Sequence, residues 1–281
     1  MIEIQNLNKK FKKKNVLHNI NIKLDNGVYG FLGANGAGKT TLLRCLTLLY
    51  QEGYKNIYFN DVLASKNKEF LNKIGYLPQQ FGLFNELTVF EGMQLMANFK
   101  GMKKIDAIED INKCLELVNL RDEKNKKIRA LSGGMVRRLG IAQALLNDPE
   151  IIILDEPTAG LDPMERLRFK SIISKIKKEK TLIISTHIVE DIEAICDYVI
   201  IIDSGEIKGC MSCDELQKLA EGKVFEVPES DFEKLYGVVY TEKTYERDGV
   251  LYARILSAQK QNYTICQTNI EDGYLCVING I

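Results

Sequence analysis

The sequence predicts an α/β protein built on a mainly parallel sheet with helices on both faces. Short apolar runs of strand length, rich in Ile, alternate with segments of helical periodicity along the first two hundred residues. Such alternation is typical of a doubly wound sheet, because each crossover helix returns the chain to begin another parallel strand. The expected strands are residues 27–32, 73–77, 151–155, 181–185 and 198–203, and the expected helices include residues 39–49, 163–178 and 188–196.

Two segments depart from this alternation. Residues 81–146 have a mainly helical pattern without a convincing strand, which predicts a helical subdomain (about residues 81–147) inserted into the α/β core. Beyond residue 215 the composition changes, and we expect a small α+β region over residues 215–281 after a main domain of residues 1–214. Its expected strands are residues 224–227, 238–245, 250–257 and 274–278, with one helix over residues 228–236.

Composition and charge exclude several classes of protein. Thirty-eight basic and 38 acidic residues give a formal net charge of zero, so we expect no nucleic-acid partner. The longest apolar runs are far shorter than the roughly 20 residues that a membrane-spanning helix needs. The N-terminus has no secretory signal pattern, and the seven cysteines then favour a reducing compartment, so we expect a cytoplasmic location. Cys210 and Cys213 have C-x-x-C spacing, but no second pair supports a metal site.

A glycine-rich motif lies between the first strand pattern of the α/β core and a helix pattern. Gly33-Ala34-Asn35-Gly36-Ala37-Gly38-Lys39-Thr40 satisfies G-x-x-x-x-G-K-[ST], and Thr41 continues into the helix. The glycines let backbone N–H groups turn toward phosphate oxygens, and the helix adds its positive end. Lys39 is expected to reach the β- and γ-phosphates and Thr40 to ligate Mg²⁺. This predicts a P-loop NTPase-type fold that binds ATP.

Two acids follow the apolar run at residues 151–154. In α/β sheets, ligands bind at the carboxyl ends of the strands. Asp155 is expected to hold Mg²⁺, mostly through water, and Glu156 to orient the water that attacks the γ-phosphate.

A second phosphate-binding pattern occurs in the helical insert. Ser132 can cap the helix that follows, and Gly133 and Gly134 expose N–H groups at its positive end. The segment Leu131-Ser132-Gly133-Gly134-Met135 resembles the signature motif of the ABC (ATP-binding cassette) ATPase family. The resemblance covers roughly residues 1–210. It implies an antiparallel N-terminal β subdomain and a head-to-tail dimer, in which each signature closes over the γ-phosphate held by the other copy.

Other positions match the family pattern one by one. Gln79, after the strand pattern at residues 73–77, resembles the glutamine that reaches Mg²⁺ and the attacking water and senses the membrane partner. His187 resembles the switch histidine near the γ-phosphate, and residues 159–162 resemble the loop that links the two sites. Phe11 lies where the family places an aromatic that stacks on adenine, with a core residue of a hairpin as the alternative.

The resemblance implies the ATP-hydrolysing subunit of a transporter, bound to a separate transmembrane permease on the inner face of the cell membrane. Met135 in place of the commoner Gln is similar to subunits of the multidrug and antibiotic exporter type, so we expect export. A homodimer and a heterodimer with a paralogous ATPase both fit. The alternatives are a soluble ABC ATPase acting on ribosomes or DNA and a non-catalytic nucleotide-binding module. Intact Lys39, Asp155, Glu156 and His187 argue against the non-catalytic module.

Overall fold

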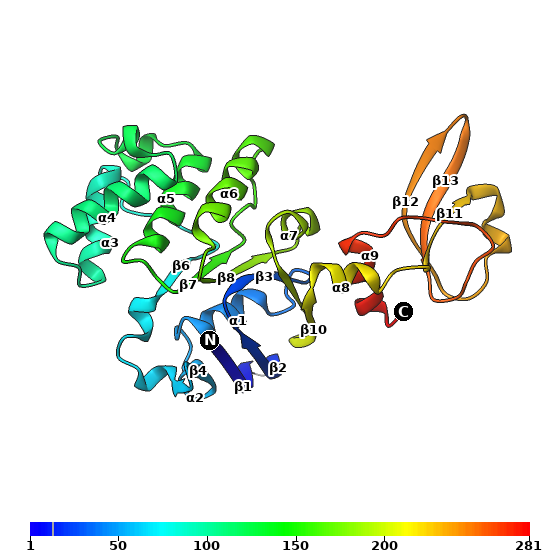
Figure 1. The fold of residues 1–281 in the computed structure, drawn as a ribbon, viewed down its shortest axis with the longest axis horizontal. Coiled ribbons are helices and arrows are strands. Elements are labelled where there is room, and N and C mark those ends of the chain that lie inside the picture. The colour runs from blue at the N-terminus through cyan, green and yellow to red at the C-terminus, as the bar shows by residue number, and fades with distance from the viewer. Residues whose placement is uncertain (13) are drawn as a thin grey trace. The chain divides into compact units, whose positions relative to one another are not determined.

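The computed structural model describes residues 1–12 and 14–281. The chain divides into two compact units, Met1–Ile207 and Lys208–Ile281. Their helices and strands are labelled in Figure 1. Among the described residues, no helix is both long and apolar enough to span a bilayer.

The central sheet is mainly parallel. Its strand order is β10-β9-β3-β8-β7-β6, and the pairs β9–β3, β3–β8, β8–β7 and β7–β6 are parallel. The strands are β3 (Gly27–Leu32), β6 (Ile74–Leu77), β7 (Ile151–Asp155), β8 (Thr181–Thr186), β9 (Tyr198–Asp203) and β10 (Glu206–Ser212). The predicted α/β class is confirmed.

Burial on both faces explains the uninterrupted apolar character of these strands. Along β7, Ile151 and Ile153 point into one core, while Ile152 and Leu154 point into a second core. The first core includes helix α1 (Lys39–Leu46), and the second includes α6 (Pro163–Ile176). A strand covered on both sides needs apolar residues at consecutive positions, as parallel sheets show in general.

An antiparallel sheet covers the α1 side. Its order is β2-β1-β4-β5, and Ile2 and Ile4 of β1 share the core of α1. The strands are β1 (Ile2–Phe11), β2 (Lys14–Leu24), β4 (Ile57–Phe59) and β5 (Val62–Leu63). Short helices accompany them: α2 (Gly53–Asn56) and the 3-10 turns Ala64–Lys66 and Phe70–Lys73.

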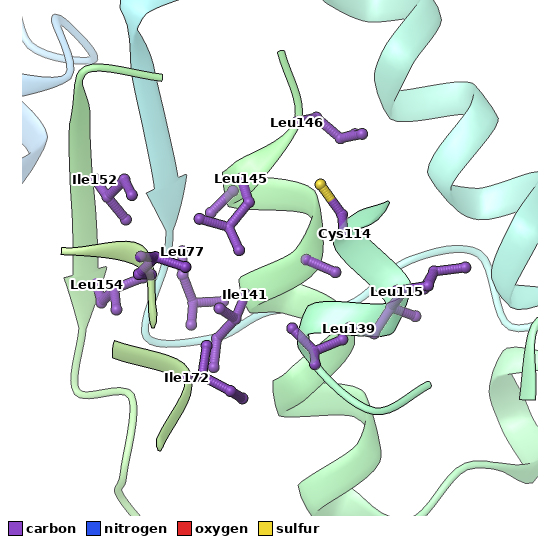
Figure 2. Close-up of a cluster of buried hydrophobic side chains, with 14 of the residues drawn as sticks. Leu77, Cys114, Leu115, Leu139, Ile141, Leu145, Leu146, Ile152, Leu154 and Ile172 are labelled. Carbon is purple, nitrogen blue, oxygen red and sulfur yellow. The ribbon is translucent and has the colours of Figure 1, made fainter. Parts of the chain in front are cut away.

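The insert is helical, as predicted. It contains α3 (Val89–Phe99), α4 (Lys104–Leu117) and α5 (Gly133–Leu145), with 3-10 turns at Arg121–Glu123 and Ile128–Ala130. Helix α5 contributes Leu139 and Ile141 to a core that also holds Leu115 of α4 and Leu154 of β7 (Figure 2). Because it packs against both the sheet and another helix, α5 is buried continuously from Arg138 to Leu145.

The second unit is a small α+β structure. Its sheet has the order β12-β13-β11-β14. The elements are α8 (Cys213–Lys218), β11 (Val224–Pro228), the 3-10 helix Glu229–Lys234, β12 (Val239–Arg247), β13 (Val250–Ser257), β14 (Thr264–Ile265) and α9 (Ile270–Asn279). Helix α7 (Val189–Ile195) completes the first unit.

For the second unit, one prediction was wrong and another was confirmed only in part. Residues 274–278 form part of α9 and not a strand, because the helix begins earlier, at a capping box of Asn269 and Asp272. Ile270, Gly273 and Cys276 are then buried at helical spacing. Residues 228–236 form only a 3-10 helix, since no side chain caps its start and none of its residues is buried.

Close packing of β6 on α5 gives a stability prediction. A Cβ added to Gly75 would lie 1.9 Å from the carbonyl oxygen of Ala144, so the strand and the helix must separate. We expect Gly75→Ala to lower the free energy of unfolding by about 1–3 kcal/mol, measured by urea denaturation. Gly82→Ala is the control, since a Cβ there meets no atom within 4 Å. Equal stability of the two variants would contradict the close approach.

Candidate functional site

The glycine-rich loop follows β3 and leads into α1. Gly36 and Gly38 have φ values of 85° and 110°, which only glycine adopts readily. A Cβ on Gly33 would lie 2.2 Å from the carbonyl oxygen of Ile202, so the loop lies directly against β9. The carbonyl of Ala37 accepts a hydrogen bond from the N–H of Gly205. The loop is therefore held in one shape by its neighbours.

Lys39 is buried at the start of α1. Its Nζ donates to the carbonyl oxygens of Gly33 at 2.6 Å and Ala34 at 3.2 Å, and lies 3.7 Å from Glu156 Oε1. Burial lowers the pKa of the Lys39 ammonium, and the carboxylates of Glu156 and Asp155 oppose that shift. A phosphate group would offer this ammonium a stronger partner than neutral carbonyls.

Asp155 ends β7 with a fully buried carboxylate. Its Oδ1 accepts hydrogen bonds from Thr40 Oγ1 at 3.2 Å and from Ser185 Oγ at 2.5 Å. Its Oδ2 is buried without a hydrogen-bond partner among the described residues. A buried carboxylate oxygen is costly unless a cation or water satisfies it. With the Thr40 hydroxyl beside it, this oxygen fits Mg²⁺, which prefers oxygen ligands.

Glu156 has a strained backbone. Its φ of 50° lies in the left-handed region, which costs a residue with a side chain about 1–2 kcal/mol. The N–H of Glu156 donates to Ser185 Oγ at 3.0 Å, and its carbonyl accepts from Arg137. Its Oε2 lies 2.9 Å from Nδ1 of His187. The surrounding hydrogen bonds hold the strained conformation, a feature common at functional sites.

Most of the residues predicted to bind the nucleotide line one pocket of about 430 Å³. Its lining residues are Phe11, Val16, Asn35, Gly36, Gly38, Lys39, Thr40, Thr41, Gln79 and Glu156. Asp155 and His187 do not line the pocket themselves, but each is hydrogen-bonded to a residue that does: Asp155 to Thr40, and His187 to Glu156. The predicted residues Gly33 and Ala37 form the buried back of the loop.

Phe11 is at the end of β1 with 40% of its surface exposed. Its ring meets Tyr50 edge to face, with 5.4 Å between the ring centroids, and Lys9 Nζ lies 4.6 Å from its centroid. These contacts orient the ring without covering it, so it can offer a face to a base.

Ser132, Gly133 and Gly134 do not line this pocket. Ser132 caps α5, and its Oγ accepts a hydrogen bond from the N–H of Met135 at 3.3 Å. Gly133 lines a second hollow, of about 550 Å³, which shares only Gln79 with the lining of the first. Within one chain, the two predicted phosphate-binding segments therefore line separate pockets.

Two residues that sequence reasoning gave no role contact the acids. Ser185 lies opposite Asp155 in the β7–β8 pairing. Its hydroxyl donates a hydrogen bond to the Asp155 carboxylate and accepts one from the N–H of Glu156. Arg137 reaches the loops after β6 and β7 from α5. Strand register and helix packing create these contacts, and neither is visible in the spacing of the motifs.

Comparison with known proteins agrees with this geometry. Residues 17–159 match the family model described as ABC transporter. The bacitracin transport ATP-binding protein BcrA of Bacillus licheniformis is 35% identical, over 97% of this chain and 90% of that protein. The methionine import ATP-binding protein MetN of Clostridium acetobutylicum is also 35% identical, over 84% of this chain and 74% of that protein.

Solved structures agree as well. The bacterial ABC transporter cassette MJ0796, solved as a dimer, superposes with a TM-score of 0.66 at 27% identity, covering 75% of this chain and 98% of that chain. The same cassette in a post-hydrolysis state bound to ADP and Pi gives a TM-score of 0.65 at the same identity and coverage. The chain belongs to the ABC transporter family and is an ATP-binding subunit that hydrolyses ATP.

Proposed function

We propose that this subunit powers export through a separate transmembrane permease. The supporting observation is the extent of the match to BcrA, which includes nearly the whole chain and therefore the second unit, whereas the match to MetN is shorter. Met135 after the signature favours the same exporter type. The subunit would then lie in the cytoplasm, peripheral to the inner face of the membrane, where the permease anchors it.

The residues of the first pocket bind the nucleotide in this proposal. Lys39 binds the β- and γ-phosphates, and the N–H groups from Asn35 to Thr41 surround them. Phe11 stacks on the adenine, which is worth about 1–3 kcal/mol for a base on an aromatic ring. These contacts bind ATP but do not by themselves cleave it.

Hydrolysis depends on the two acids at the carboxyl end of β7. Thr40 and Asp155 would hold Mg²⁺, with Gln79 completing the site, and a bound Mg²⁺ would neutralise charge that develops on the phosphates. Glu156 orients the attacking water and accepts its proton. His187, whose Nδ1 lies 2.9 Å from the Glu156 carboxylate, orients that carboxylate and would contact the γ-phosphate.

The signature acts on the nucleotide of a second subunit. Because Gly133 and the glycine-rich loop line separate pockets, a head-to-tail dimer is the arrangement that uses both, and the related cassette MJ0796 is a dimer. In a homodimer, two copies of this chain supply two complete sites, and a heterodimer with a paralogous ATPase is the alternative. ATP favours closure by supplying charge to both positive helix ends, and hydrolysis releases it.

Glu156→Gln tests the catalytic assignment. The amide keeps the shape of the carboxylate but cannot accept a proton, so we expect ATP to bind while turnover falls by at least about 100-fold. Size-exclusion chromatography with ATP should then show a stable dimer for this variant and mainly monomer for the wild type.

Glu150→Gln is the matched control, because Glu150 precedes the opposite end of β7 and its half-exposed carboxylate forms an ion pair with Lys73. Its turnover should equal that of the wild type. Undiminished turnover by Glu156→Gln would move the role of base to another residue.

Export can be tested in inside-out membrane vesicles that contain the subunit and its permease. With bacitracin as the first probe, we expect ATP to drive accumulation of the probe inside the vesicles, and Glu156→Gln to abolish it. ATP-dependent loss of preloaded probe from the vesicles would instead indicate import.

A further inference from the structure

Two consecutive arginines on α5 hold different parts of the molecule. Arg138 is buried and bonds to Glu165 and to the carbonyl oxygens of Val118 and Asn119. It therefore ties α5 to α6 and to the end of α4, which is a structural role. Arg137 lies on another face of the helix and, with Gly133, lines the second hollow.

The guanidinium of Arg137 binds three backbone carbonyls. Nε donates to Pro157 at 2.9 Å, one terminal nitrogen donates to Gln79 at 3.0 Å, and the other donates to Glu156. These carbonyls belong to the loops that follow β6 and β7. A planar guanidinium with donors on all three nitrogens can join three acceptors at once, which an ammonium cannot do with the same geometry.

The Arg137 guanidinium lies where burial disfavours its charged form. Burial lowers the pKa of Arg137, and the nearby carboxylates of Asp155 and Glu156 oppose that shift. A charged group in such a position must be compensated by specific hydrogen bonds. The three carbonyls give that compensation, so their positions and that of the guanidinium depend on one another.

The contact to Glu156 bears on catalysis. Hydrogen bonds hold that residue in its left-handed backbone conformation: its N–H donates to Ser185, and its carbonyl accepts from Arg137 and from the N–H of Ala159 at 3.3 Å. Without Arg137, the bond from Ala159 holds the carbonyl less firmly, and the peptide after Glu156 can shift toward a relaxed conformation. The carboxylate would then leave the position fixed by His187 and Lys39.

We propose that Arg137 of α5, the helix capped by Ser132, is a positioning residue for hydrolysis: it sets the positions of the Glu156 carboxylate and the Gln79 loop. This inference rests on the proposed roles of Glu156 and Gln79. Arg137 does not touch the nucleotide in this account. It acts through the two loops that do.

The test separates turnover from binding. We expect Arg137→Gln to lower kcat on the order of 10- to 100-fold, as a small displacement of a catalytic group does. ATP affinity, measured with a fluorescent nucleotide, should stay at the wild-type value because Lys39 and the glycine-rich loop are untouched. Arg137→Lys should recover part of kcat, since an ammonium can bind some of the same carbonyls.

The matched control is Arg129→Gln, which removes a guanidinium that is 63% exposed and pairs with Glu86. Its kcat and ATP affinity should equal those of the wild type. Thermal unfolding of each variant in ATP shows whether the fold is kept. A wild-type kcat for Arg137→Gln, or a loss of ATP affinity as large as the loss of kcat, would overturn the proposal.

A double variant distinguishes this inference from the proposed function. If Arg137 acts through Glu156, adding Arg137→Gln to Glu156→Gln should not lower the single-turnover rate further. Multiplying losses would overturn the action of Arg137 through Glu156 while leaving Glu156 as the base. Full turnover by Glu156→Gln alone would instead overturn the assignment of Glu156, whatever Arg137 does.

Discussion

The site depends on one constraint: two carboxylates must be kept at the buried end of β7. Asp155 and Glu156 are almost wholly inaccessible to solvent, where unpaired charge is costly. The Ser185 hydroxyl donates to the Asp155 carboxylate and accepts from the N–H of Glu156. From the start of α1, Thr40 donates to Asp155, and Lys39 lies 3.7 Å from the Glu156 carboxylate. The strand order β3-β8-β7 brings these groups together, because parallel strands end at one edge of the sheet. The central sheet therefore determines the chemistry as well as the fold.

Two charged groups at this site, the Asp155 carboxylate and the Lys39 ammonium, can each bind a further partner. Asp155 Oδ2 lacks a partner among the described residues, which suits a metal ion. Lys39 is held by loop carbonyls and a carboxylate 3.7 Å away, which a phosphate can outcompete. Mg²⁺ and a phosphate have opposite charges and would arrive together in a nucleotide complex. The proposed complex of ATP with Mg²⁺ would therefore satisfy both groups at once.

The parts predicted well from the sequence are those with local signals. The strand, glycine-rich loop and α1 follow each other in the chain, and so do β7 and its two acids. Ser185 and Arg137 were missed because their roles arise from strand register and helix packing. In the second unit, the Ile- and Val-containing end of α9 resembled a strand. Its helical state depends on a cap at Asn269 and on Asp272 meeting Arg254 of β13, a contact far away in the sequence.

In the proposed dimer, each complete site combines the glycine-rich loop of one subunit with the signature of another. Mixing two inactive variants, with the permease or at a protein concentration that permits dimers, tests it most directly. Lys39→Ala retains a sound signature, and Ser132→Arg retains a sound glycine-rich loop. A mixed dimer then contains one intact site, so ATPase activity should return in part on mixing. Wild-type hydrolysis by Ser132→Arg alone would contradict the claim.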